Sequence, residues 1–242
     1  MVSTVIHPND DMFAGSHEHY DSVGAQMTGF ADHAAKLAGS TAPVVLELPC
    51  GYGRVTRHMV ERFVPANMHV ADIMAPSVDF CVETFGVHGY HVIDPIYEFR
   101  NIPDNTFDVA IMGSLITHLS EEASLIVLEH FFRKIRAGGV GVVTTHGVQS
   151  RERHSADDWY QVGDAARDYL IKKYDANEFG FVAYAEDHSK EKKTVDYIGS
   201  SYGISLIPRA WVESACNRLG LNIIEERPAG WDDHQDVFFI AR

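Results

Sequence analysis

The chain has 242 residues, 45% of them hydrophobic and 22% charged, and its 20 basic against 34 acidic side chains give a formal net charge of −14. This length and composition predict one globular domain with a sizeable core. The acidic balance argues against a nucleic-acid partner, because binding a phosphate backbone draws on clustered Lys and Arg.

Cysteine usage and hydropathy indicate the compartment. The three cysteines form no CxxC pair, which favours reduced thiols in a cytoplasm over a disulfide framework. Residues 1–11 lack the apolar stretch of a signal peptide, and no apolar run approaches the ~20 residues that cross a bilayer. We therefore expect a cytoplasmic protein without membrane contact.

The predicted elements alternate between helices and strands. A polar arm over residues 1–18 precedes one or two helices over 19–38. The strands are then expected at 43–48, 68–72, 88–93, 106–112, 138–145, 222–227 and 236–241, and the helices at 53–64, 76–85, 120–136, 157–173 and after Pro208. Residues 146–206 depart from this alternation. A structureless loop of that length is improbable in a compact domain, so we interpret it as a folded insertion that covers the ligand end.

The segment Val44–Arg54, with the sequence VVLELPCGYGR, is the most informative part of the chain. A short apolar run ends at Glu47, a turn with Gly51 and Gly53 follows, and an amphipathic segment comes next. Asp72 ends the following strand, 19 residues after Gly53. This spacing suits a carboxylate that accepts hydrogen bonds from ribose hydroxyls in a βαβ unit.

These motifs resemble the class I S-adenosylmethionine-dependent methyltransferases. The first motif of that family, acidic-x-Gly-x-Gly-x-Gly, is similar to Glu47-x-Pro49-x-Gly51-x-Gly53, and Asp72 matches its ribose-binding acid. Residues 107–119 resemble the family's fourth strand and loop, and residues 138–143 its Gly-Gly turn and fifth strand. The resemblance covers about two thirds of the chain, in the order of the family.

The resemblance implies an α/β fold with a Rossmann-like, seven-stranded, mostly parallel sheet, helices on both faces and the last strand antiparallel. The cofactor implied is S-adenosyl-L-methionine, with S-adenosyl-L-homocysteine as the product. We expect a single domain with an arm or lid at 1–40, a cofactor-binding core at 41–146, a substrate cap at 147–206, and a C-terminal helix and strand hairpin at 207–242.

One position departs from the family pattern. Pro49 replaces the first glycine, so this position has φ near −65° and no N–H to offer a ligand. The methionine end of the cofactor must therefore be held by Gly51, Gly53 and side chains.

The resemblance also implies a set of cofactor-binding residues. They are Tyr20, Glu47, Pro49, Gly51, Gly53, Arg54, Asp72, Ile73, Asp94, Gly113 and Ser114. Structural alternatives exist for four of them. Glu47 could merely cap the turn, and Asp72 could serve as a helix N-terminal acid. Asp94 could be a solvated loop acid instead of a contact to the adenine. Tyr20 could pack as an aromatic side chain on the core instead of donating a hydrogen bond to the cofactor's carboxylate.

Methyl transfer is an in-line displacement that needs alignment and the exclusion of water. A hydroxyl nucleophile must also lose a proton, which calls for a base such as histidine. His118, His146 and His234 fall in predicted ligand-end loops. In relatives the position of His118 mostly orders its own loop, and for His146 and His234 the base and structural interpretations both remain open.

The substrate is expected among aromatic side chains. We assign substrate contacts to Trp231, Tyr184 and Tyr202, although Trp231 could instead pack against the insertion. The insertion and its tail hold a tyrosine cluster: Tyr160, Tyr169, Tyr174, Tyr184, Tyr197 and Tyr202. Such a cluster suits a partly apolar or sugar-like ligand, and equally the interface of a homodimer.

The predicted function is therefore methylation of a small molecule, with a hydroxyl on a sugar, glycoconjugate or secondary metabolite as the preferred acceptor. One alternative is a nicotinamide-dependent oxidoreductase, which usually carries all three glycines. Another is a non-catalytic S-adenosylmethionine-binding partner protein. A metal site is not expected, because His17-Glu18-His19 has no identifiable third ligand.

Overall fold

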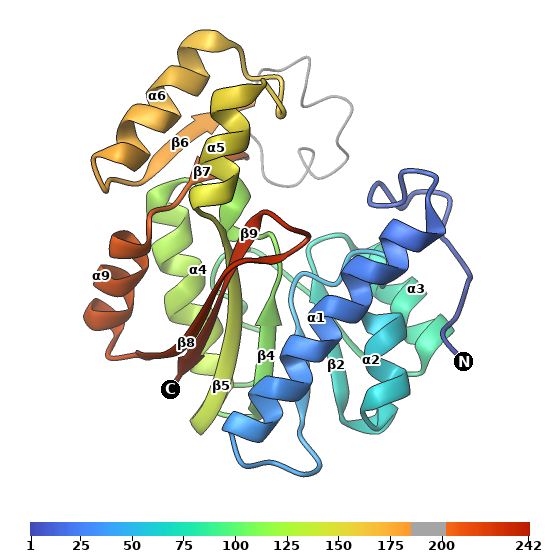
Figure 1. Cartoon of the computed structure of the whole chain (residues 1–242). Coiled ribbons are helices and arrows are strands. Elements are labelled where there is room, and N and C mark those ends of the chain that lie inside the picture. The colour runs from blue at the N-terminus through green and yellow to red at the C-terminus, as the bar shows by residue number, and fades with distance from the viewer. Residues whose placement is uncertain (185–201) are drawn as a thin grey trace. The chain divides into compact units, whose positions relative to one another are not determined.

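The computed structural model describes residues 1–184 and 202–242, which divide into two compact units (Figure 1). Unit 1 comprises Met1–Gly113, His130–Val142 and Ala241–Arg242, and unit 2 comprises Ser114–Glu129 and Val143–Ile240. None of the helices in the described residues has the length and apolarity needed to cross a membrane.

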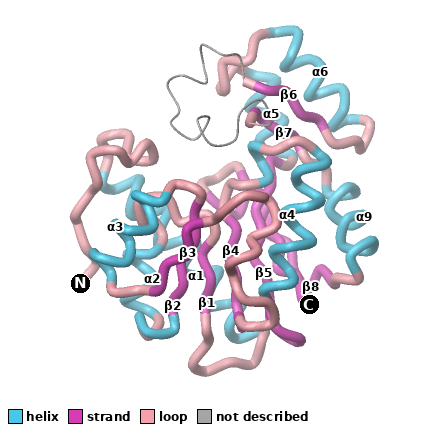
Figure 2. The backbone as a smooth tube through the Cα atoms, turned by 180° about the vertical axis from the view of Figure 1, so that it is seen from behind, coloured by secondary structure: helices cyan, strands magenta, loops and turns pink. Residues whose placement is uncertain are grey.

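Seven strands form the main sheet, in the order β3-β2-β1-β4-β5-β9-β8. They are β1 (Val45–Glu47), β2 (Met68–Asp72), β3 (His88–His91), β4 (Phe107–Met112), β5 (Ile135–His146), β8 (Asn222–Trp231) and β9 (Gln235–Ala241). Strand β1 pairs in parallel with β2 and β4, and β2 pairs in parallel with β3 (Figure 2). The last strands run antiparallel. The predicted fold class is confirmed.

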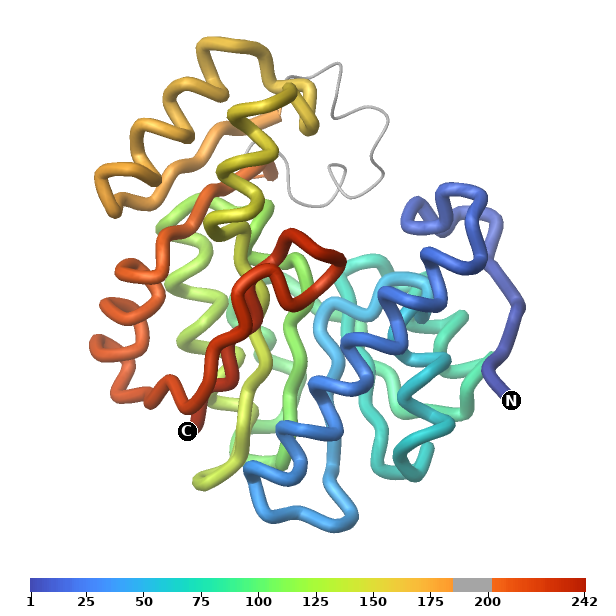
Figure 3. Tube along the Cα trace, in the orientation of Figure 1, coloured from blue at the N-terminus to red at the C-terminus, as the bar shows by residue number. Residues whose placement is uncertain are grey.

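Unit 1 places three helices beside its strands: α1 (His17–Leu37), α2 (Thr56–Arg62) and α3 (Ala75–Phe85). Helix α1 is one continuous helix, where one or two were expected. Its N-cap Ser16 accepts a hydrogen bond from the His19 N–H, and it buries Val23, Met27 and Phe30. Helix α1 packs against α2 (Figure 3).

Helix α4 (Glu121–Lys134) begins after Ser120, whose hydroxyl accepts a hydrogen bond from the Ala123 N–H, as an N-cap side chain does. The expectation that Gly138-Gly139 separates helix from strand is wrong. Strand β5 begins at Ile135, directly after the helix, so both glycines lie inside the strand. Gly138 supplies φ +76° there, a conformation that favours glycine.

The described residues of the predicted insertion, 147–184 and 202–206, form helices and strands, but the helix boundaries differ from the expectation. Instead of one helix over 157–173, unit 2 contains α5 (Val148–Ala156) and α6 (Asp164–Asp175). The Asp158 carboxylate accepts hydrogen bonds from the N–H groups of Val162 and Gly163. This side-chain turn satisfies backbone donors that a continuous helix would use, and it separates the two helices.

The remaining elements of unit 2 complete a second small core. Strands β6 (Gly180–Ala183) and β7 (Gly203–Leu206) pair antiparallel, and α9 (Arg209–Leu219) follows Pro208. Leu170 of α6 packs with Ile204 and Leu206 of β7 in the buried cluster. This apolar contact makes the segment a packed element of unit 2, which a structureless loop would not provide.

Candidate active site

The turn after β1 is joined to the end of β2. The Cys50 N–H donates to the carbonyl oxygen of Ala71 over 3.0 Å, and the Gly51 N–H donates to the Asp72 carboxylate over 2.9 Å. Strand β1 ends at Glu47, between its parallel neighbours β2 and β4. The structure therefore brings together the turn and the carboxylate that the sequence assigned to one ligand.

Glu47 is a buried acid with a raised pKa. Its side chain is 3% exposed and accepts a 2.6 Å hydrogen bond from the Thr56 hydroxyl. Burial raises the pKa of Glu47 to about 8, the nearby charge of Asp72 adds to the rise, and Thr56 and Arg54 oppose it. The carboxyl group therefore carries a proton at neutral pH until a cation approaches it.

Asp72 is buried as well, and burial raises its pKa against the opposing effect of backbone donors. One of its oxygens accepts from the Gly51 N–H and the other from the Met74 N–H. A carboxylate offers about four acceptor positions, so these two bonds leave capacity for a ligand's hydroxyl groups.

The two glycines of the turn, Gly51 and Gly53, differ in how much space surrounds them. Both take positive φ, +49° for Gly51 and +78° for Gly53. A Cβ on Gly53 would lie 2.5 Å from the Phe85 ring, so packing against α3 requires glycine there. A Cβ on Gly51 would meet nothing within 4 Å, so open space adjoins the residue that bonds Asp72.

The other predicted cofactor residues lie in different surroundings. Pro49 belongs to the turn, and burial raises the pKa of both Glu47 and Tyr20 while the charge of Arg54 opposes the rise. Ile73 is half-buried directly after Asp72, whereas Asp94 is exposed in the loop after β3. No contact joins Asp94 to the turn in the described residues, so its adenine role stays a prediction.

Gly113 ends a segment of unit 1, and Ser114 begins unit 2. The Ser114 N–H donates to the Thr144 hydroxyl over 2.8 Å, and its own hydroxyl accepts from the Gln235 side chain over 3.1 Å. These bonds hold the loop after β4 within unit 2. A cofactor contact of either residue stays a prediction.

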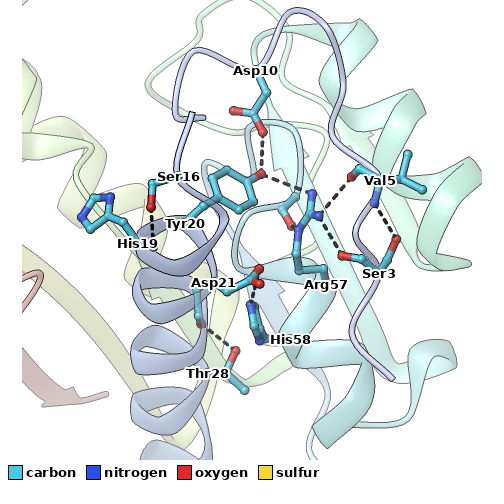
Figure 4. A network of polar contacts seen from close by, with 12 residues as sticks. Ser3, Val5, Asp10, Ser16, His19, Tyr20, Asp21, Thr28, Arg57 and His58 are labelled. Carbon is cyan, nitrogen blue, oxygen red and sulfur yellow. Dashed lines mark hydrogen bonds and ion pairs between the residues drawn. The ribbon is translucent and has the colours of Figure 1, made fainter. Parts of the chain in front are cut away.

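Tyr20 is buried on α1, with its hydroxyl between two polar side chains (Figure 4). The hydroxyl donates to the Asp10 carboxylate over 2.5 Å and accepts from the Arg57 guanidinium over 3.2 Å. Sequence reasoning missed Asp10 and Arg57. Arg57 is fully buried, yet no periodicity marks it, because the apolar residues of this segment, Val55, Met59 and Phe63, lie at other positions.

In unit 2, three histidines donate one ring N–H to the backbone. The Nδ1 atom lies 2.8 Å from the Gly203 carbonyl oxygen in His118, 3.2 Å from that of Ser205 in His146, and 2.6 Å from that of Asp232 in His234. A carbonyl oxygen only accepts, so Nδ1 carries the proton in each ring. In the neutral form Nε2 then bears the lone pair.

His146 is completely buried, and its second nitrogen is occupied. The Tyr160 hydroxyl lies 3.0 Å from His146 Nε2 and donates to it. Burial and the neighbouring histidines lower the pKa of His146 well below its usual value. The ring of His154 stacks on Tyr160, and both of its buried nitrogens are without a partner among the described residues. Tyr160 belonged to the predicted tyrosine cluster, but its contact with His146 carries no sequence signal.

The predicted substrate residues are mostly enclosed. Trp231 is 3% and Tyr184 8% exposed, whereas Tyr202 is half-buried. The rings of Tyr184 and Tyr202 both pack against His118. The structure therefore gathers these two tyrosines around one histidine, and their contact with a substrate stays a prediction. Tyr197 lies outside the described residues.

No group of three or more His, Cys, Asp or Glu side chains in residues 1–184 and 202–242 is arranged to hold a metal ion. The three cysteines are free thiols, and all are buried.

Comparison with known proteins shows a similarity to methyltransferases over part of the chain. Residues 45–139 match the family model described as a methyltransferase domain. A search of curated proteins gives no match. Among solved structures, an S-adenosylmethionine-dependent methyltransferase of Leishmania major is 12% identical with a TM-score of 0.60, over 94% of this chain and 75% of its own.

Two proteins of Burkholderia thailandensis are also similar. Its 1,6-didemethyltoxoflavin-N1-methyltransferase, solved with 1,6-didemethyltoxoflavin and S-adenosylhomocysteine, is 12% identical over 92% of this chain and 79% of its own, with a TM-score of 0.58. An O-methyltransferase family protein is 16% identical over 95% of this chain and 61% of its own, with a TM-score of 0.53. These likenesses establish a shared fold.

Proposed function

We propose that this chain, whose residues 45–139 match a methyltransferase domain and whose fold is that of S-adenosylmethionine-dependent methyltransferases, methylates a hydroxyl group of a small molecule, with His234 as the general base. In unit 1 the cofactor is held by the turn with Gly51 and by the carboxyl groups of Glu47 and Asp72. The Gly51–Asp72 hydrogen bond supports this assignment, because it unites the two groups that would bind one ligand.

The observation that carries the choice of base is the tautomer of His234. Its Nδ1–H donates to the Asp232 carbonyl oxygen over 2.6 Å, which leaves the Nε2 lone pair to accept a proton. As the acceptor oxygen attacks the methyl carbon, the carbon–sulfur bond breaks and its electron pair stays on sulfur as a thioether. The hydroxyl proton passes to Nε2, and the ring becomes an imidazolium.

His234 fits this role better than the other two histidines. In His146 the Nε2 lone pair already accepts the proton of Tyr160. His118 ties its loop to β7 through the Gly203 carbonyl oxygen, which supports the loop-ordering role. The proposal therefore assigns His146 and His118 to the structure of unit 2, where the sequence left them as candidate bases.

Helix α5 holds the turn that carries His234. The Ser150 hydroxyl donates to the His234 carbonyl oxygen over 2.8 Å, and the Arg153 guanidinium donates to that of Asp233 over 3.1 Å. Burial first, and then the charge of Arg153, lower the pKa of His234. A lowered pKa favours the neutral imidazole, which is the form that can accept a proton.

The surroundings of His234 favour an acceptor with an apolar face. Trp159 stacks on the His234 ring, has the Arg153 guanidinium over its own ring at 4.6 Å, and is 54% exposed, so the exposed part of its indole offers an apolar contact area. Flat aromatic surfaces suit the apolar faces of sugars and planar metabolites. A hydroxyl on a sugar, glycoconjugate or secondary metabolite is the acceptor class that we propose.

The test is an acceptor screen with S-adenosylmethionine against hydroxylated sugars, glycosides and phenols, in which mass spectrometry detects the methylated product. With an acceptor in hand, His234→Gln should lower kcat by at least about 100-fold and leave the affinity for S-adenosylhomocysteine unchanged. His130→Gln, on α4 in unit 1, is the matched control. Full turnover in His234→Gln would refute the assignment of the base.

A further inference from the structure

We propose that the Tyr20 hydroxyl serves two carboxylates in turn: that of Asp10 in the free protein, and that of the cofactor's methionine moiety in the complex. Cofactor binding then releases the turn around Asp10. This inference rests on the proposed cofactor site, and it adds a contact within the chain that competes with the cofactor.

The Asp10 carboxylate occupies a built site. Asp10 is 9% exposed, and its Oδ2 atom accepts from the Tyr20 hydroxyl while Oδ1 accepts from the Met12 N–H over 3.0 Å. Backbone hydrogen bonds from Asp10 to His7 and from Phe13 to Asp10 form the turn that presents it. Tyr20 thus already binds one carboxylate, supplied by the chain itself (Figure 4).

Arg57 donates a hydrogen bond to the Tyr20 hydroxyl and has no N–H left for another acceptor. A guanidinium has five N–H groups, and all five are used here. Nε donates to Gly53, one terminal nitrogen donates to Ser3 and Val5, and the other donates to Tyr52 and to the Tyr20 hydroxyl. The phenol has a single proton to donate, and its oxygen accepts from Arg57. That proton can serve one carboxylate at a time.

The same arginine connects Tyr20 to the cofactor turn. Its Nε donates to the Gly53 carbonyl oxygen and one terminal nitrogen donates to that of Tyr52, so the Arg57 side chain bridges the Tyr20 hydroxyl and that turn. A Cβ on Gly24, one helical turn after Tyr20, would lie 2.2 Å from the Arg54 carbonyl oxygen. This face of α1 therefore lies directly against the turn.

The sequence of the turn creates a need for this donor. Pro49 has no N–H, so the turn offers one backbone donor fewer to the methionine end of the ligand. A second carboxylate beside Asp10 would meet like charge, which is unfavourable at short range. Arg57 lies over the Tyr20 ring at 4.8 Å, and all of its N–H groups are engaged, so it offers no donor to a second carboxylate. The two carboxylates therefore exclude each other.

Calorimetry with two ligands tests the proposal. S-adenosylhomocysteine carries the amino-acid carboxylate, and 5′-methylthioadenosine lacks it. Asp10→Ala should bind S-adenosylhomocysteine roughly three- to tenfold more tightly, since the lost internal bond is a charged one, and bind 5′-methylthioadenosine as before. Tyr20→Phe should weaken only the first ligand, by about tenfold. In a Tyr20→Phe background, Asp10→Ala should give no further gain.

Asp11→Ala, at the exposed neighbouring residue, is the matched control and should change neither affinity. Asp10→Asn keeps the size of the side chain and should give a smaller gain than Asp10→Ala, and melting temperatures verify that each variant is folded. Hydrogen exchange gives a second measure: S-adenosylhomocysteine should accelerate exchange of the Met12 amide, because the carboxylate that accepts its hydrogen bond moves away.

The outcomes separate this inference from the proposed function. Two results would overturn the competition and show that Asp10 closes over the cofactor. One is weaker S-adenosylhomocysteine binding in Asp10→Ala, and the other is slower hydrogen exchange of the Met12 amide in the complex. An equal change for both ligands would reduce Asp10 to a structural role. If the intact protein binds neither ligand, the proposed cofactor site itself fails.

Discussion

The backbone N–H of Gly51 donates to the carboxylate of Asp72, which ties the turn after β1 to the end of β2 by one 2.9 Å hydrogen bond. The Cys50 N–H, bonded to the Ala71 carbonyl oxygen, makes a second connection one residue earlier. The conformation of the turn and the position of the carboxylate therefore depend on each other, and a change in either should be felt by a ligand bound to both.

Alanine at the two glycines of the turn should give different results. Gly53→Ala adds a Cβ 2.5 Å from the Phe85 ring at φ +78°, so we expect a loss of roughly 2–4 kcal/mol in the free energy of unfolding. Gly51→Ala meets no atom within 4 Å and should cost about 1 kcal/mol for its positive φ alone. Urea denaturation measures both. Equal losses would contradict the packing role of Gly53.

Glu47 should make stability depend on pH. Its folded-state pKa of about 8 lies above the ordinary value of 4.5, so the contribution is complete below pH 4.5 and is lost as the pH rises through 8. Glu47→Gln should remove this pH-dependent contribution, which amounts in total to a change on the order of a few kcal/mol in the free energy of unfolding. The measurement is the difference in the free energy of unfolding between the two proteins from pH 4 to 9. A constant difference would contradict the raised pKa.

Cofactor binding should release a proton from Glu47. At pH 7 the free protein holds this carboxyl in its protonated form, because burial disfavours the charge. The ligand's ammonium group favours the carboxylate, so S-adenosylhomocysteine should displace up to about one proton. Calorimetry in buffers of different ionisation enthalpy counts it. The release should vanish in Glu47→Gln, and its persistence there would assign the proton to another group.

Tyr160→Phe should destabilise unit 2 without changing cofactor affinity. The variant removes the proton donated to His146 Nε2 and leaves a buried acceptor unpaired, which costs roughly 1–3 kcal/mol. Tyr169→Phe is the control, because Tyr169 is 45% exposed on α6. Thermal melting compares the two. Identical melting curves would show that the His146–Tyr160 bond contributes nothing.

The sequence predicts strand β2 and the neighbouring turn well because their determinants are local. Strand β2 has the predicted bounds of 68–72. The turn, Asp72 and the start of α3 follow from apolar runs, glycines and a proline that act within a few residues of one another. The roles of Asp10 and Arg57 could not be predicted, because their hydrogen bonds join segments that are distant in the sequence. Arg57, for example, donates to the carbonyl oxygens of Ser3 and Val5, more than fifty residues away.

The insertion was harder to predict for a related reason. A helix is expected at 157–173, but the side chain of Asp158 turns the chain there, and Gly163 takes φ +85° before α6. The pairing of His146 with Tyr160, and the tautomer of His234, depend on tertiary contacts. The sequence shows which residues can carry a proton, and the folded chain determines which nitrogen remains able to accept one.

The central claim is that the turn after β1 and Asp72 bind one adenosyl ligand. Titration calorimetry with S-adenosylhomocysteine tests it most directly, on the intact chain, on Asp72→Ala, and on Asp79→Ala as an exposed control in unit 1. We expect saturable binding to the intact chain and the control, and a loss of at least about 100-fold in affinity in Asp72→Ala. No binding to the intact chain, or equal affinity in all three proteins, would contradict the account.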